Sequence, residues 1–134
     1  MAQLDALAAP SARDLTRDYM IAQLTYRSIT GPWESGVPEQ RPDRFFTIEE
    51  LNSKSEFGVV ADAQLLQIRA YDLYEARAMS TGRLIKALWA VMPAEFQVQS
   101  VEHVGGPSHS LDPDVPGLHR STVIAWVTVM NEVT

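Results

Sequence analysis

Residues 97–130 read QVQSVEHVGGPSHSLDPDVPGLHRSTVIAWVTVM and predict two strands joined by a long connection. The first strand is expected over 97–104 and the second over 119–130. The second strand is β-branched and apolar at both of its alternating sets of positions, which is typical of a strand with two covered faces. Both faces of the sheet are therefore expected to be covered where this strand lies.

The connection between these strands is expected to be a loop over residues 105–118. Gly105-Gly106-Pro107 end the first strand, because glycine and proline interrupt regular structure. Asp112-Pro113-Asp114 and Pro116-Gly117 add turn-forming sequence, and no helical or strand period runs through this stretch. Loops of this length in a small domain are usually functional or disordered. This one carries no catalytic grouping, so we expect a contact surface.

Three further strands are predicted before this pair, over 33–36, 44–51 and 63–71. In the middle one, Phe46 and Ile48 share one face while Phe45 lies on the other, because strand side chains alternate. The polar, charged residues 52–58 that follow are expected to form a loop.

Two helices are predicted, over about 12–28 and about 74–92. Ser11 is a suitable N-cap for the first, with Asp14 adding favourable charge near its start. Asp72 and Glu75 resemble a capping box for the second, and Pro93 is expected to end it. Residues 1–10 are expected to be a flexible N-terminal arm.

The order of elements is helix, short strand, two strands, helix, two strands. This order favours an α+β fold, a small mixed or antiparallel sheet of four to five strands with two helices packed on one face. Alternation places an apolar set on the other face: Phe45, Tyr71, Trp126 and Met130. An uncovered face of this kind needs a cover, and a neighbouring subunit is the natural candidate.

Composition narrows the function classes. A chain of 134 residues predicts one domain, residues 1–134. Its net charge of −6 and scattered basic residues disfavour nucleic-acid recognition and attraction to anionic lipid. The absence of cysteine excludes disulfides and cysteine-based metal sites. Without a long apolar run or a signal-peptide start, the chain is expected to have no membrane partner and to be cytosolic.

An ordered set of motifs resembles a protein family. DYMIAQL at 18–24 is followed by RPDRFF at 41–46 and LLQIRAY at 65–71, and the set closes with VEHVGGP at 101–107 and DPD at 112–114. Over about residues 13–130, this combination is similar to the tail terminator proteins of long-tailed bacteriophages, of the kind found in phages of actinobacteria.

The resemblance implies a structural virion protein without enzymatic activity, assembled in the host cytoplasm. Members form a hexameric ring on the head-proximal end of the tail tube. The ring terminates tube polymerisation and forms the head–tail joining interface. The implied partners are other copies of the chain, the tail tube protein and a head-completion or connector protein. DNA passes through the lumen without sequence-specific binding, and an acidic chain is compatible with that passage.

No catalytic, cofactor-binding or metal residue is assigned, and no cofactor is expected. The candidate subunit or tube interface comprises Trp33, Arg41, Arg44, Gly105, Gly106, Pro107, Asp112 and Asp114. Arginine suits such contacts because it makes bidentate pairs with carboxylates. The alternative interpretations stay open: the two arginines can be ordinary surface residues beside a turn, and Trp33 can belong partly to the core.

Other functions compete with this interpretation. The chain could be another connector component, a head-closure or tail-tube protein. It could also be a small metal-dependent or hydrolytic enzyme. The candidate metal ligands are His103, His109, His119, Asp112 and Asp114, although their spacing matches no defined site. Ser108, Ser110, His109 and Asp112 supply the residue types of a hydrolase triad without a nucleophile-elbow motif. Glu49 and Glu50 are neighbours on a strand and point to opposite faces, which argues against a catalytic pair.

Overall fold

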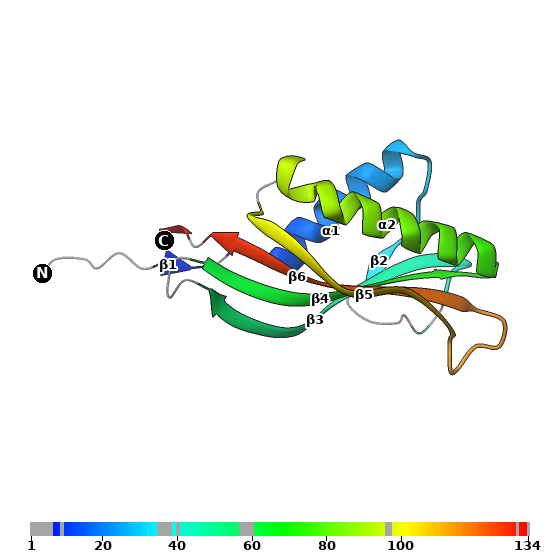
Figure 1. Ribbon diagram of the computed structural model, residues 1–134. Coiled ribbons are helices and arrows are strands. Elements are labelled where there is room, and N and C mark those ends of the chain that lie inside the picture. Colours follow the sequence, from blue (N-terminus) through cyan, green and yellow to red (C-terminus); the bar gives the residue numbers. More distant parts are fainter. Residues whose placement is uncertain are drawn as a thin grey trace, which may run out of the picture.

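The computed structural model describes residues 7–8, 10–34, 39, 41–56, 61–95, 98–130 and 132–133. A long, twisted sheet carries two helices on one side (Figure 1). The elements in chain order are β1 (Leu7–Ala8), α1 (Ala12–Tyr26), β2 (Trp33–Glu34), β3 (Arg44–Glu56), β4 (Ala61–Asp72), α2 (Glu75–Glu95), β5 (Ser100–Leu111), β6 (His119–Met130) and β7 (Glu132–Val133).

The main sheet has five strands in the order β2-β3-β4-β6-β5. β2 runs parallel to β3 and the other neighbours are antiparallel, so the sheet is mixed. β1 and β7 form a separate antiparallel pair. The α+β fold with both helices on one face is therefore confirmed. The expected loose arm over residues 1–10 is wrong at β1, because Leu7 and Ala8 pair with β7; residues 1–6 and 9 lie outside the described residues.

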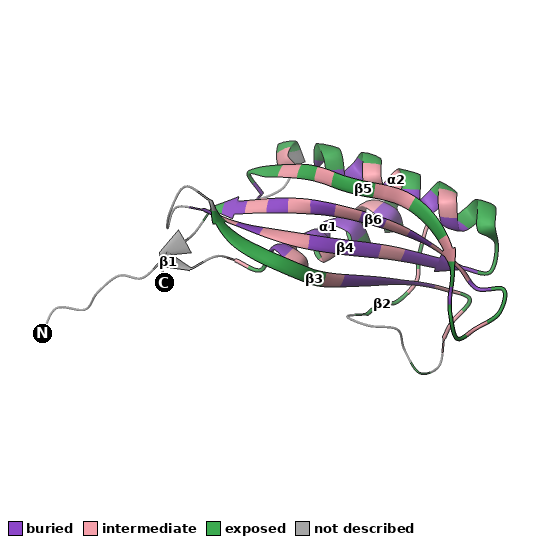
Figure 2. Cartoon of the chain, turned by 60° about the horizontal axis from the view of Figure 1, so that its bottom comes forward, coloured by how far each residue is buried: buried purple, intermediate pink, exposed green. Residues whose placement is uncertain are grey.

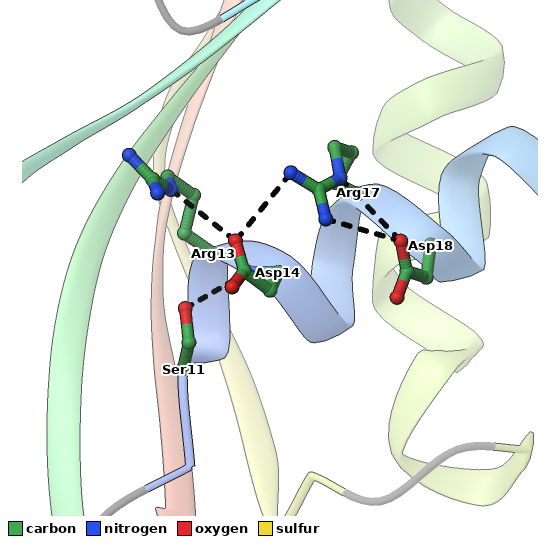
Figure 3. Close-up of polar contacts among 5 residues, drawn as sticks. All are labelled: Ser11, Arg13, Asp14, Arg17 and Asp18. Atoms are coloured by element: carbon green, nitrogen blue, oxygen red, sulfur yellow. Dashed lines mark hydrogen bonds and ion pairs between the residues drawn. The ribbon is translucent and has the colours of Figure 1, made fainter.

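Helix α1 begins where the sequence predicts. The Ser11 side chain caps it by accepting a hydrogen bond from the Asp14 backbone N–H at 3.1 Å. Arg13, Asp14, Arg17 and Asp18 form a line of ion pairs along its outer side (Figure 3). On its inner side the Tyr19 hydroxyl donates to the Leu88 carbonyl of α2 at 3.0 Å, which ties the two helices together.

Helix α2 does not end at Pro93, as expected, but continues to Glu95. A proline removes one helical hydrogen bond and disturbs the preceding turn, and only two residues of the helix follow Pro93. Gly82 lets this helix approach the sheet closely. A methyl group there would meet the Ser121 side chain and lie 3.1 Å from the Pro107 Cβ. Ser121 uses this proximity to donate to the Ala78 carbonyl at 2.8 Å.

The loop expected over 52–58 is wrong for its first part, because β3 continues to Glu56. A bulge between Glu50 and Asn52 shifts the register, and pairing with β4 then resumes to the Glu56–Ala61 pair. Residues 57–58 lie outside the described residues. The polar sequence is that of an exposed strand, which needs no apolar face of its own.

The loop expected over 105–118 is also wrong, since β5 starts at Ser100 and runs to Leu111. Gly105-Gly106-Pro107 lie inside this strand at two register shifts against β6. Gly106 has φ +99°, and a Cβ there would overlap the backbone of Thr122 and Val123. β5 is an edge strand, where a proline and a bulge are tolerated. Only residues 112–118 form the loop.

The core lies between the helices and the sheet. Its largest fully buried side chains there include Met20, Phe46, Ile68 and Trp89. Figure 2 shows the opposite face, which neither of the two described helices crosses. A second, smaller cluster lies at one end of that face. The rings of Phe45 and Tyr71 stack there with their centres 4.2 Å apart, and Leu118 and Val115 of the 112–118 loop pack over them.

Candidate functional site

Four of the eight predicted interface residues gather at one end of the sheet. Arg44 starts β3, Arg41 precedes it, and Asp112 and Asp114 belong to the loop after β5. The end of β4 and the start of α2 lie at the same end, since Asp72 pairs with both Arg44 and His119 in the sheet register. The structure therefore brings these four residues together within one chain, which the sequence alone did not predict.

Asp112 organises the loop that covers Phe45 and Tyr71. It is buried, and its Oδ1 accepts from the backbone N–H groups of Asp114 and Val115 at 2.7 and 3.1 Å. Its Oδ2 lies 3.3 Å from the Arg41 Nε, and a second guanidinium nitrogen of Arg41 lies 3.4 Å from Asp114. Arg41 thus engages two carboxylates of its own chain, and this network holds the loop against the sheet.

Arg44 is also engaged within the chain. Its Nε lies 3.1 Å from Oδ2 of the buried Asp72, which Arg77 of α2 approaches at 3.2 Å. The other Asp72 oxygen accepts from the Tyr74 N–H at 3.1 Å, at the start of α2. Asp72 therefore forms a turn just before α2 and not the expected capping box with Glu75, because its side chain accepts from Tyr74. Two arginines balance its buried charge.

The other predicted interface residues lie elsewhere. The rings of Trp33 and Phe46 stack with their centres 4.7 Å apart, and Trp33 packs against the core. This agrees with the alternative interpretation that Trp33 belongs partly to the core. Gly105-Gly106-Pro107 lie on the edge strand, where the Lys86 ammonium donates to the Gly106 carbonyl at 3.1 Å. None of these four joins the network around Asp112.

The hydrolase triad suggested by residue types does not assemble. Asp112 is paired with Arg41, and the Ser110 hydroxyl accepts from Arg120 at 2.7 Å. The Ser108 hydroxyl donates to the Thr122 carbonyl at 3.5 Å. His109 instead faces His119. Neither Ser108 nor Ser110 therefore hydrogen-bonds to an imidazole in the described structure, as the nucleophile of a triad does.

The histidines divide into a pair and a single residue. His109 Nε2 and His119 Nδ1 lie 2.9 Å apart, and Glu75 Oε1 lies 3.8 Å from His109 Nδ1. His103 lies nearer the start of β5. Its ring is edge-on to the Trp89 ring, and the two ring centres are 5.9 Å apart. Burial lowers the pKa of His103, and the nearby charge of Lys86 lowers it further. His103 is therefore neutral near pH 7 and apart from the pair.

Glu75 was missed as a potential metal ligand by sequence reasoning. Among the described residues, Glu75, His109 and His119 are the group of three whose ligand atoms come within 4.8 Å of one another. Asp112 and Asp114, which the sequence suggested as ligands, face Arg41 instead. The sequence shows that Glu75 opens a predicted helix. It does not show that this helix packs beside β5 and β6, which is what brings Glu75 to the histidines.

The described helices leave the opposite face of the sheet uncovered (Figure 2). Val123, Ala125, Val127 and Val129 of β6 face the helices, so the residues between them face away. We define the open face by Thr122, Ile124, Trp126 and Thr128 and by their neighbours across β4 and β5. Trp126 is flanked by Leu65 and Glu102, and the Lys54 ammonium lies 4.5 Å from its ring centre.

A hollow of about 480 Å³ lies on the far part of the β3–β4 hairpin. The residues that line it are polar or charged: Glu50, Ser53, Lys54, Ser55, Asp62 and Gln64. Sites for small organic ligands are predominantly apolar with a few polar groups. This lining does not favour a small-molecule site.

Comparison with known proteins adds no identification. No protein-family model matches the chain, and no curated protein matches it in sequence. Among the helices in the described part of the chain, none is long and apolar enough to cross a membrane.

Proposed function

We propose that the chain is a structural subunit of a bacteriophage tail, a terminator that forms a ring on the head-proximal end of the tail tube. Its action is capping: the ring covers the surface that the next tube ring needs and presents a different surface to the head connector. The proposal rests on the ordered motifs between residues 13 and 130 and on one structural observation, the open face. A sheet whose second face lacks helices suits an assembly subunit.

A second copy of the chain is the occupant we assign to the open face. This face combines apolar groups, Ile124 and Trp126, with charges of both signs, including Lys54 and Glu102. Met130, at the end of β6, is 46% exposed. Apolar groups within a charged rim are typical of protein interfaces, and mixed charges allow two copies to pair opposite signs. A repeated head-to-tail contact closes into a ring when its rotation permits.

The 112–118 loop has a supporting role in this proposal. Asp112 and Arg41 fix its shape, while the Asp114 side chain is 74% exposed and remains accessible to a neighbour. Contacts of Trp33, Arg41, Arg44 and Gly105-Gly106-Pro107 with other subunits or the tube stay a prediction. The net charge of −6 is compatible with a lumen through which DNA passes without sticking.

Light scattering across a concentration series, with negative-stain microscopy, tests this proposal. Closed rings of uniform mass, about six chains each, are the expected result, because closed symmetry limits growth. Open-ended tubes would overturn it in favour of a tube protein. A mass that stays monomeric at every concentration would contradict self-association through the open face.

A matched pair of variants connects the outcome to the open face. Ile124→Glu places a charge at the centre of this face and is expected to abolish rings. Ile21→Glu places the same charge on the exposed side of α1, where Ile21 is 39% exposed, and is expected to leave rings intact. Equal loss in both variants would argue that the open face is not the contact.

A further inference from the structure

The imidazoles of His109 and His119 and the carboxylate of Glu75 converge at the end of the sheet, on the helix side. We propose that these three residues bind one divalent first-row transition-metal ion, with Zn²⁺ as the best match to the donor set. Imidazole nitrogen and carboxylate oxygen are common ligands of zinc, and three protein ligands leave a coordination position for water. This site does not depend on the proposed ring.

The fold brings the ligands together from three elements. His119 is the first residue of β6 and pairs with Leu111, while His109 lies two residues before Leu111 on β5. The two histidines are thus diagonal neighbours on one face of an antiparallel pair, within reach of long side chains. Glu75, the first residue of α2, lies on the same side, since α2 contacts both strands.

The distances suit an ion after a small rearrangement. A zinc ion with ligand distances of about 2.0–2.1 Å holds tetrahedral ligand atoms about 3.3 Å from one another. The two imidazole nitrogens, 2.9 Å apart, need to separate by a few tenths of an ångström. The three ligand atoms lie within 4.8 Å, and the Glu75 side chain, 61% exposed, is free to turn inward.

The surrounding charges leave these donors available. The buried carboxylate of Asp72, the last residue of β4, is engaged by Arg44 and Arg77. The Arg77 guanidinium also lies over the Tyr74 ring at 5.3 Å. His109 keeps part of its side chain exposed, so an ion reaches the pair from solvent. A bound ion would connect α2 to the β5–β6 hairpin.

Isothermal calorimetry with ZnCl₂ on the full chain, free of any histidine tag and treated with chelator, tests the proposal. We expect one ion per chain. His109→Ala and His119→Ala are expected to weaken binding by about tenfold or more, and Glu75→Gln to weaken it less. Asp114→Asn is the matched control, because it removes a nearby exposed carboxylate outside the site and is expected to leave the affinity unchanged.

Two further readings keep the result interpretable. Circular dichroism establishes that each variant is folded, and a zinc-dependent rise in melting temperature is expected in the wild type and in Asp114→Asn only. Absence of binding at zinc concentrations up to about 100 µM, or one-to-one binding that persists in the folded double variant His109→Ala/His119→Ala, would overturn the proposal. The histidines would then be only a hydrogen-bonded pair.

Discussion

The two faces of the sheet are built from the same strands but differ in what covers them. The helix-covered face is apolar and closed, and Ile68, Trp89 and Ala125 lie there without contact with water. Within the described residues, the open face has an intrachain cover at one end, where Leu118 and Val115 shield Phe45 and Tyr71. The buried core on the helix side stabilises the fold, which leaves the other face available for association.

The largest expected contrast is between two tryptophans. Trp89→Ala removes a fully buried side chain and leaves a cavity beneath the helices. It is expected to reduce the free energy of unfolding by about 3–5 kcal/mol. Trp126→Ala removes a half-buried ring and its contact with Lys54, with an expected loss of only about 1–2 kcal/mol. Urea denaturation of both variants at a concentration where the chain is monomeric measures the difference. Equal losses would break the distinction between the faces.

A smaller contrast concerns the loop that covers one end of the open face. Asp112→Ala removes two hydrogen bonds from backbone N–H groups and leaves the buried Arg41 Nε without its carboxylate partner. We therefore expect the free energy of unfolding to fall by about 1–3 kcal/mol. Asp114→Ala removes an exposed partner of the same arginine, with an expected change within about 0.5 kcal/mol. Thermal unfolding of the pair checks this, and the reverse ranking would contradict the role assigned to Asp112.

The smallest expected effect is a dependence on pH from His103, which lies against Trp89 and near Lys86. Its pKa is lowered in the folded chain, so the unfolded chain binds a proton first as pH falls. The contribution of His103 to stability is therefore constant at pH values well above about 6.5 and declines as the pH falls below that value. His103→Asn is expected to flatten this decline in urea titrations between about pH 8 and 5.5. An unchanged slope in the variant would exclude His103 as its source.

Much of the fold follows from local pattern. Alternation correctly separated Phe46 and Ile48 from Phe45, because the two sets fall into different clusters. Ser11 was correctly predicted as the N-cap of α1 from its residue type and position. The strand through Gly105-Gly106-Pro107 was not predictable, because its bulge is stabilised by pairing with β6 and not by its own sequence. The polar end of β3 was missed for the same reason.

The candidate sites were less accessible to sequence reasoning. Arg41, Asp112 and Asp114 were predicted only as contacts to other subunits or the tube, and their pairing inside one chain depends on the path of the 112–118 loop. His109 and His119 come together because β5 continues past Pro107 to pair with β6, and Glu75 is brought to them by the packing of α2 on the sheet. Contacts between distant segments decided both outcomes.

The most direct measurement of the proposed division between the faces is a ¹⁹F NMR concentration series on the chain labelled with 5-fluorotryptophan. Replacing each tryptophan by phenylalanine in turn assigns the signals. Association through the open face predicts that the Trp126 signal shifts with concentration while the Trp89 signal stays fixed. A Trp126 signal that does not move while the mass of the protein rises would contradict the account, because the contact would then lie elsewhere.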